Sequence, residues 1–136
     1  MTAATTSDRF RITLGQLNPT MGDIAGNAAK ARTAWEAGRD AGADLVALPE
    51  MFILGYNSQD LVMKPAVQAA CLAAIEALAV ECADGPALAI GGPAEEDGKL
   101  FNAYFICRGG KISSKSLKHN LPNEDVFDEV RIFDSG

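Results

Sequence analysis

The chain has 136 residues, 48% of them hydrophobic and 22% charged, which is the balance of a soluble globular domain. Its 12 Lys and Arg residues are outnumbered by 18 Asp and Glu residues, giving a net charge of −6. We therefore expect no nucleic-acid partner, because phosphate binding needs a basic face. No apolar run approaches the ~20 residues of a membrane helix, so we expect no membrane partner either.

Residues 1–8 are polar and lack the apolar segment of a signal peptide. They predict a flexible tail on a cytoplasmic protein. The first predicted element is a strand over residues 10–17, in which Phe10, Ile12 and Leu14 alternate with more polar side chains. This alternation predicts that the three apolar side chains form one buried face.

A helix is predicted over residues 24–41, where small and apolar side chains recur every three or four positions. Asp23 is its expected N-cap, and Gly42 is expected to end it. The apolar run at residues 45–48 is typical of an interior strand that is buried on both faces. A loop rich in aromatic and polar residues is expected over residues 51–63.

A second helix is predicted to begin at Pro65, since proline suits the first turn of a helix, and to end near Ala83. Farther along, Gly91–Pro93 predicts a tight turn, and Asp97–Gly98 is a hairpin signal. Strands are expected over residues 87–90, 100–107 and 111–117, followed by an irregular charged segment over residues 118–136. Alternating strands and helices followed by a hairpin indicate an α/β layered domain with mixed strand directions.

Two charged residues stand at positions that often carry chemistry. Glu50 comes directly after the second predicted strand, and binding residues of α/β sheets gather at the carboxyl ends of strands. Lys118 follows the last predicted strand, and a lysine supplies positive charge where an oxyanion develops. By position alone, both are also typical of solvated surface residues. His119 is the single histidine, has no Ser or Cys motif beside it, and is expected to be exposed.

The three cysteines are Cys71, Cys82 and Cys107, an odd number without clustering. This pattern argues against a disulfide framework. A zinc site needs about four ligands, and none is laid out by three scattered cysteines and one histidine. We therefore predict three small, buried hydrophobic side chains and no metal site.

Four segments of the chain carry motifs that belong together. They are Gly15–Pro19 with Gly22, Asp23, Ile24 and Asn27; Leu48-Pro49-Glu50 with Gly55-Tyr56; Asp60-Leu61 with Lys64-Pro65; and Lys118–Asn123 with Val126–Glu129, Arg131 and Phe133. With these motifs the chain resembles the nitrilase (carbon-nitrogen hydrolase) superfamily. The first two segments are typical of the superfamily as a whole. The last two are typical of its branch formed by the glutaminase domains of glutamine-dependent NAD synthetases.

The resemblance implies an α/β fold, a nitrilase-like α-β-β-α sandwich of which residues 9–136 form an incomplete, N-terminal portion. In that family Glu, Lys and Cys carry out amide hydrolysis. Glu50 matches the glutamate that acts as general base and then as general acid, and Lys118 matches the lysine that stabilises the tetrahedral intermediate. Glu129 matches a second glutamate, which supports the lysine. Tyr56 matches an aromatic residue of the substrate pocket.

The family's nucleophilic cysteine lies a few dozen residues beyond the lysine motif, and therefore beyond Gly136. All three cysteines of this chain precede Lys118, so none of them matches it. We expect the 136-residue chain to be inactive by itself. An incomplete sheet leaves strand edges and apolar surface uncovered, so we also expect a homo-oligomer or further chain that covers them.

The resemblance further implies glutamine as the substrate and a synthetase domain as the partner. No cofactor is expected in this domain, while ATP and Mg²⁺ are expected in the synthetase domain. Two alternatives stay open: another nitrilase-type amidase, and a non-catalytic α/β binding module. One departure matters, because Glu124 stands where the branch has a tyrosine. Without this tyrosine the substrate pocket lacks an aromatic wall, and the binding of glutamine is expected to differ from that in the branch.

Overall fold

The computed structural model describes residues 8–124 and 127–136, so the predicted tail lies outside the described residues apart from Asp8. Strands and helices alternate as the sequence predicts. In chain order the elements are β1 (Ile12–Leu14), α1 (Ile24–Asp40), β2 (Leu45–Ala47), the 3-10 helix η1 (Gln59–Met63), α2 (Pro65–Glu81), β3 (Ala87–Glu96), β4 (Lys99–Arg108), β5 (Lys111–Leu117) and α3 (Glu129–Ile132).

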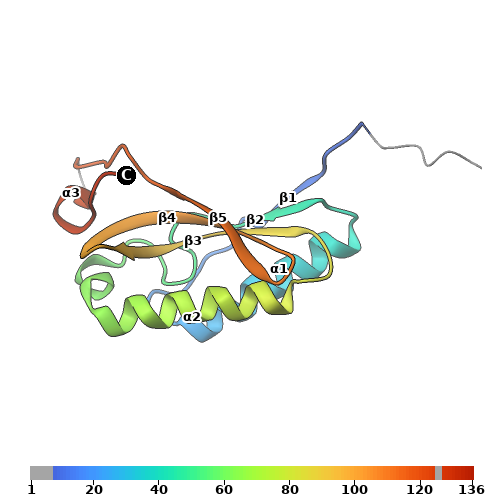
Figure 1. The fold of residues 1–136 in the computed structure, drawn as a ribbon, viewed down its shortest axis with the longest axis horizontal. Coiled ribbons are helices and arrows are strands. Elements are labelled where there is room, and N and C mark those ends of the chain that lie inside the picture. The colour runs from blue at the N-terminus through green and yellow to red at the C-terminus, as the bar shows by residue number, and fades with distance from the viewer. Residues whose placement is uncertain (1–7, 125–126) are drawn as a thin grey trace, which may run out of the picture.

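The five strands form one sheet in the order β1-β2-β3-β4-β5 (Figure 1). The first three strands are parallel, and β4 and β5 are each antiparallel to the strand before them. Parallel neighbours need crossover connections, which α1 and α2 supply. Antiparallel neighbours need only tight turns, and these lie at Asp97–Gly98 and Gly109–Gly110, where all four residues have positive φ. The predicted mixed strand directions and the hairpin at Asp97–Gly98 are confirmed.

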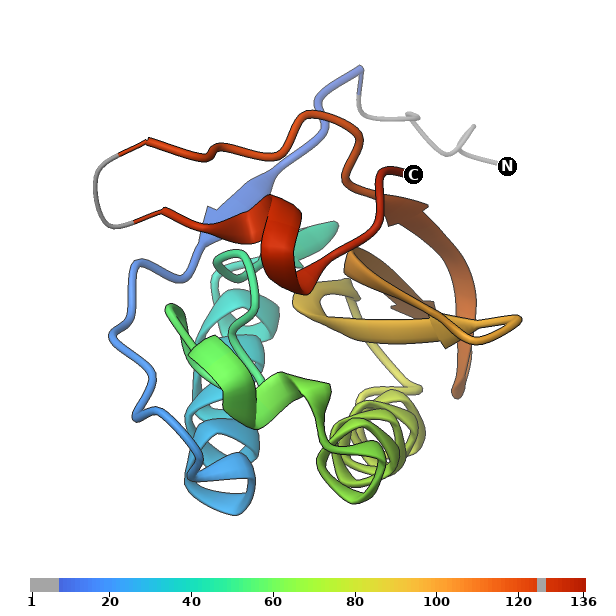
Figure 2. The ribbon, with the colours of Figure 1, turned by 90° about the vertical axis from the view of Figure 1, so that its left-hand side faces the viewer.

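Helices α1 and α2 lie together against one face of the sheet (Figure 2). Helix α1 begins where Asp23 accepts a hydrogen bond from the Gly26 N–H at 3.0 Å, which confirms the predicted N-cap. Gly38 lets α1 approach closely, since a Cβ there would lie 2.3 Å from Cγ2 of Val46 on β2. Helix α2 buries Cys71 and Ile75 against the same core. The predicted layering of helices on a sheet is therefore confirmed on this face.

The prediction for β1 is wrong in both length and orientation. The strand covers Ile12–Leu14 only, and Phe10, Ile12 and Leu14 are 68%, 53% and 68% exposed. Thr13, between them, is the residue that faces Gly38 of α1. β1 is an edge strand that pairs with β2 alone, and its apolar side chains lie on the sheet face that the helices do not cover. The three side chains do alternate with their neighbours, but the sequence does not say which side of the sheet α1 occupies.

The tight turn predicted at Gly91–Pro93 is also wrong, because β3 continues through it to Glu96. Gly91 and Gly92 allow close packing of β3 against the segment that follows β2. Gly91 lies against the backbone of Glu50 and Met51, and Gly92 lies against Ile53. A side chain at either position would collide with the segment that follows β2, so the two glycines allow that segment to cross β3 closely.

Two predicted irregular segments contain short helices. Residues 51–63 end in η1, and they begin with Met51–Leu54, which is completely buried rather than a surface loop. The charged segment over residues 118–136 contains α3. Residues 125–126, which include Val126 of the lysine motif, lie outside the described residues. In the described part of the chain, no helix is long and apolar enough to cross a membrane.

Candidate active site

Glu50 is placed by the turn that leaves β2. After Pro49 the chain reverses at Met51, which has a φ of +52° and a fully buried side chain. Met51 is thus an anchor in the core, and the neighbouring Glu50 remains at the surface with 45% of its side chain exposed. A buried residue beside an exposed carboxylate fixes the backbone from which that carboxylate projects.

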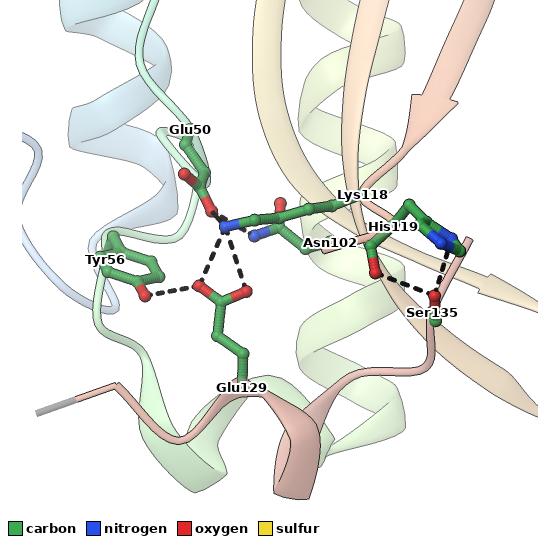
Figure 3. A network of polar contacts seen from close by, with 7 residues as sticks. All are labelled: Glu50, Tyr56, Asn102, Lys118, His119, Glu129 and Ser135. Atoms are coloured by element: carbon green, nitrogen blue, oxygen red, sulfur yellow. Dashed lines mark hydrogen bonds and ion pairs between the residues drawn. The ribbon is translucent and has the colours of Figure 1, made fainter. Parts of the chain in front are cut away.

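Lys118 reaches this carboxylate from the end of β5. Its Nζ donates to Oε1 of Glu50 over 2.7 Å, and the same ammonium lies 3.2 Å and 3.1 Å from the two carboxylate oxygens of Glu129 (Figure 3). Partial burial by itself would lower the pKa of Lys118. The hydrogen bonds to the two carboxylates, together with their negative charge, outweigh this effect, and the pKa lies above its ordinary value of 10.5. One ammonium therefore serves two carboxylates, and it stays charged at neutral pH.

Glu129 is the buried member of this group, with 3% of its side chain exposed. Its Oε1 accepts a hydrogen bond from the Tyr56 hydroxyl at 2.6 Å. Burial first, and then the hydrogen bond and charge of Glu129, raise the pKa of Tyr56, so this hydroxyl remains a donor. Oε2 of Glu129 pairs with the Lys118 ammonium but makes no well-directed hydrogen bond. The buried carboxylate thus keeps the capacity to accept one more donor.

The segment carrying Glu129 is tied to the sheet and to η1. Arg131 pairs with Asp60 of η1 and with Asp128, each at 2.6 Å. At the other end, the Asp134 N–H donates to the Leu100 carbonyl at 2.7 Å. The pair between Arg131 and Asp60 joins the two motifs typical of the NAD synthetase branch. These two residues lie 71 positions apart in the sequence. These contacts place α3 beside the strand ends that carry Glu50 and Lys118.

A hollow of about 370 Å³ opens beside Glu50 and Lys118, on the face of the sheet opposite the helices. It is lined by Leu48, Glu50, Asn102, Tyr104, Ser116, Leu117 and Lys118. A larger apolar groove of about 660 Å³ lies between α2, the β3–β4 hairpin and α3, and contains none of the clustered charges. The smaller hollow is therefore the one where a bound molecule would meet reactive groups.

The four predicted site residues lie together. Glu50, Lys118, Glu129 and Tyr56 form one connected cluster, although the sequence separates them by up to 79 positions. His119 is exposed as predicted, with Nδ1 2.7 Å from the Gly136 carbonyl. Tyr56 contacts Glu129 through its hydroxyl and lies 6.0 Å from the Phe127 ring.

The three cysteines are 0%, 3% and 2% exposed, which confirms them as buried side chains. None of them belongs to the described lining of the hollow beside Glu50. Burial raises the pKa of each thiol to about 11. Within residues 8–124 and 127–136, no group of three His, Cys, Asp or Glu side chains is placed to hold a metal ion.

Sequence reasoning did not single out Asn102. This residue lies in the middle of β4, is 3% exposed, and donates from Nδ2 to Oε1 of Glu50 at 2.5 Å. The available signal was a polar residue inside the apolar run 100–107, since a buried amide requires partners. The run does not say which partner, because Glu50 lies 52 positions earlier.

The fold agrees with what comparisons with known proteins show. The carbon-nitrogen hydrolase family profile matches residues 11–136, and the chain belongs to that family. It is 58% identical over 130 residues to a glutamine-dependent NAD(+) synthetase of Rhodobacter capsulatus, covering 96% of this chain and 24% of that protein. It is 35% identical to the corresponding synthetase of Thermotoga maritima, covering 94% of this chain and 22% of that protein.

Solved structures give the same relationship. A glutamine-dependent NAD(+) synthetase from Acinetobacter baumannii matches with a TM-score of 0.87 and 32% identity, over 93% of this chain and 24% of that one. An amidase from Nesterenkonia sp. matches with a TM-score of 0.79 at 21% identity, over 93% of this chain and 48% of that one, which shows the shared fold. The chain is thus homologous to the N-terminal, glutaminase region of these synthetases, and spans about a quarter of their length.

Proposed function

We propose that this chain is the N-terminal part of a glutaminase domain in a glutamine-dependent NAD synthetase. The observation that carries the proposal is the single ammonium of Lys118, held between Glu50 and Glu129 at the rim of a hollow. The family relationship and the 58% identity to one such synthetase support the same function. In this proposal the domain releases ammonia from glutamine, and a separate domain uses it with ATP and Mg²⁺ to amidate deamido-NAD.

The proposed reaction begins when a cysteine thiol supplied by chain beyond Gly136 attacks the side-chain amide carbon of glutamine. Glu50 takes the thiol proton and then delivers it to the departing nitrogen, which leaves as ammonia. Lys118 stabilises the oxyanion of the tetrahedral intermediate by its positive charge. Water then hydrolyses the glutamyl thioester, giving glutamate and restoring the thiol. No cofactor enters these steps.

Glu129 supports Lys118 in the proposal. It holds the Lys118 ammonium from the side opposite Glu50, and Tyr56 in turn holds Glu129. Its buried Oε2 pairs with the Lys118 ammonium and lies away from the hollow, so Glu129 acts on the substrate only through Lys118. Phe127, beside Tyr56, supplies an aromatic surface near the position where Glu124 departs from the branch.

The test measures ammonia release from glutamine by the complete protein that the gene encodes. Glu50→Gln is expected to lower kcat by about 10²–10⁴-fold, since it removes a proton-transfer group. Lys118→Met is expected to lower it by about 10²–10³-fold, since it removes an oxyanion-stabilising charge. The matched control is Lys115→Met on β5, which loses an ion pair with Glu96 and lies outside the hollow.

Wild-type turnover in either Glu50→Gln or Lys118→Met would overturn the proposal. The isolated 136-residue chain is expected to release no ammonia, because its cysteines are buried away from the hollow. Release by that chain, abolished by Glu50→Gln, would contradict the assignment of the nucleophile. A different nitrilase-type amidase would share Glu50 and Lys118, so these variants do not test that alternative. Ammonia release from a panel of other amides does, because a glutaminase is expected to prefer glutamine.

A further inference from the structure

Asn102 is hydrogen-bonded to both proposed catalytic residues without carrying a charge itself. Its Nδ2 donates to Oε1 of Glu50 at 2.5 Å, and its backbone carbonyl accepts a hydrogen bond from the Lys118 N–H at 2.8 Å. Figure 3 shows its amide directed at the Glu50 carboxylate beside the Lys118 ammonium. One residue of β4 thus links the turn after β2 to the end of β5.

The backbone around Asn102 is well fixed. Asn102 is opposite Pro93 of β3, and the next residue, Ala103, is opposite Leu117 of β5. A strand paired on both sides holds its side chains more firmly than a turn does. Glu50, by contrast, projects from a turn with a half-exposed side chain that has several rotamers available. The fixed partner of this pair is therefore the amide, and the movable partner is the carboxylate.

Both donors reach the same oxygen of Glu50. Asn102 and Lys118 each donate to Oε1. Among the described contacts this leaves Oε2 as the oxygen that can accept a proton. If Glu50 takes a proton on Oε2, it loses its charge and much of its attraction for the Lys118 ammonium. Oε1 is then a carbonyl oxygen, which still accepts a hydrogen bond from a neutral amide.

We propose that Asn102 is a positioning residue that holds Oε1 of Glu50 in both protonation states, so that Oε2 stays directed at the reacting atoms. This inference rests on the proposed function. Lys118 alone cannot do this, because it is shared with Glu129 and its hold on Glu50 weakens when Glu50 is protonated. The geometry assigns the orientation of the base to an uncharged side chain on a rigid strand.

The first experiment measures glutamine hydrolysis by the complete protein with Asn102→Leu. Loss of the amide donor is expected to lower kcat by about 10–100-fold with KM nearly unchanged, because a misdirected base slows the chemistry and not the binding. A kcat within about twofold of wild type would overturn the inference. Thermal unfolding of the variant is recorded in parallel, and a loss of kcat without a loss of folded protein supports it.

The second experiment uses Asn102→Asp, which keeps the shape and places a second carboxyl group against Glu50. Like charges at this distance favour protonation of one carboxylate, so the acid limb of kcat/KM is expected to move by about one pH unit or more to higher pH. Asn18→Asp adds the same charge on an exposed side chain and is expected to leave the limb in place. An unmoved acid limb in Asn102→Asp would overturn the inference, since a purely structural role does not predict the shift.

A third measurement needs no substitution at Asn102. In the isotope-labelled chain, the NMR signals of the Asn102 side-chain amide are expected to shift when Glu50 is replaced by Gln, and unchanged signals would overturn the contact. A wild-type protein that releases no ammonia would overturn the proposed function itself. An active wild type whose activity is indifferent to both Asn102 variants would overturn only the role of Asn102.

Discussion

Gly91 on β3 lies directly against the backbone of Met51: a Cβ at Gly91 would come within 2.2 Å of the Met51 nitrogen. Met51 has positive φ and directly follows Glu50, so the missing side chain at Gly91 makes room for the turn that presents the proposed base. A residue with no chemical group of its own thereby determines where the carboxylate lies.

Gly91→Ala is expected to displace this turn and to destabilise the chain by about 1–3 kcal/mol, because the colliding atoms belong to backbone that cannot rotate away. Denaturant unfolding measures the loss. The neighbouring Gly92→Ala is the control and is expected to cost less, since its contacts at 2.9 Å and 3.0 Å are with side-chain methyl groups of Ile53 and Ile75 and not with backbone at 2.2 Å. Equal costs for the two substitutions would contradict the explanation.

Asn27 joins the loop before α1, at Thr20, to the segment that follows Glu50, at Ile53. It is fully buried, donates from Nδ2 to the Thr20 and Ile53 carbonyls at 2.8 Å and 3.1 Å, and accepts from the Thr20 N–H at 2.8 Å. Asn27→Ala leaves these groups without partners, and the free energy of unfolding should fall by about 3 kcal/mol. Asn120→Ala, at an exposed position, should change it by less than about 0.5 kcal/mol. A comparably mild effect of Asn27→Ala would show that the loops do not depend on it.

Stability should depend on pH through Lys118. Its pKa in the folded chain is raised above 10.5, so its stabilising contribution is complete below that pH and is lost as pH rises through the folded pKa. The difference in unfolding free energy between wild type and Lys118→Met should therefore be constant near neutral pH and shrink above about pH 10.5. Glu129→Gln removes one of the carboxylates that raise this pKa, so the contribution should be smaller and its loss should be complete at a lower pH. A difference that stays constant into strong alkali would contradict the geometry.

The three cysteines should be unreactive in the folded chain. With burial raising each pKa to about 11, roughly one thiol in a thousand is ionised at pH 8. Alkylation followed by mass spectrometry should be at least ~100-fold slower in the folded chain than in guanidinium, where the thiols are exposed and ordinary. Rapid native labelling of Cys71, Cys82 or Cys107 would reopen it as a candidate nucleophile. In the complete protein, the proposed function predicts rapid labelling of a further cysteine.

Much of this fold is encoded locally. The spacing of apolar residues predicts α1 and α2, Asp23 predicts the start of α1, and Asp97–Gly98 predicts a hairpin, because each of these depends on residues within a few positions of one another. The motifs around Glu50 and Lys118 also mark both residues from the sequence alone. Local patterns thus determine the elements and single out two of the reactive side chains.

Tertiary structure alone decides what these residues do together. The exposed apolar face of β1 depends on which side of the sheet α1 occupies. The local sequence at Gly91 predicts a turn, because the residue that Gly91 packs against, Met51, is 40 positions away. The contact between Asn102 and Glu50 depends likewise on strand order and register, which no local pattern specifies. The sequence determined by itself that a glutamate and a lysine stand at strand ends. Only the packed sheet decides that they share an ion pair, since contacts between distant residues are set by the arrangement of whole elements.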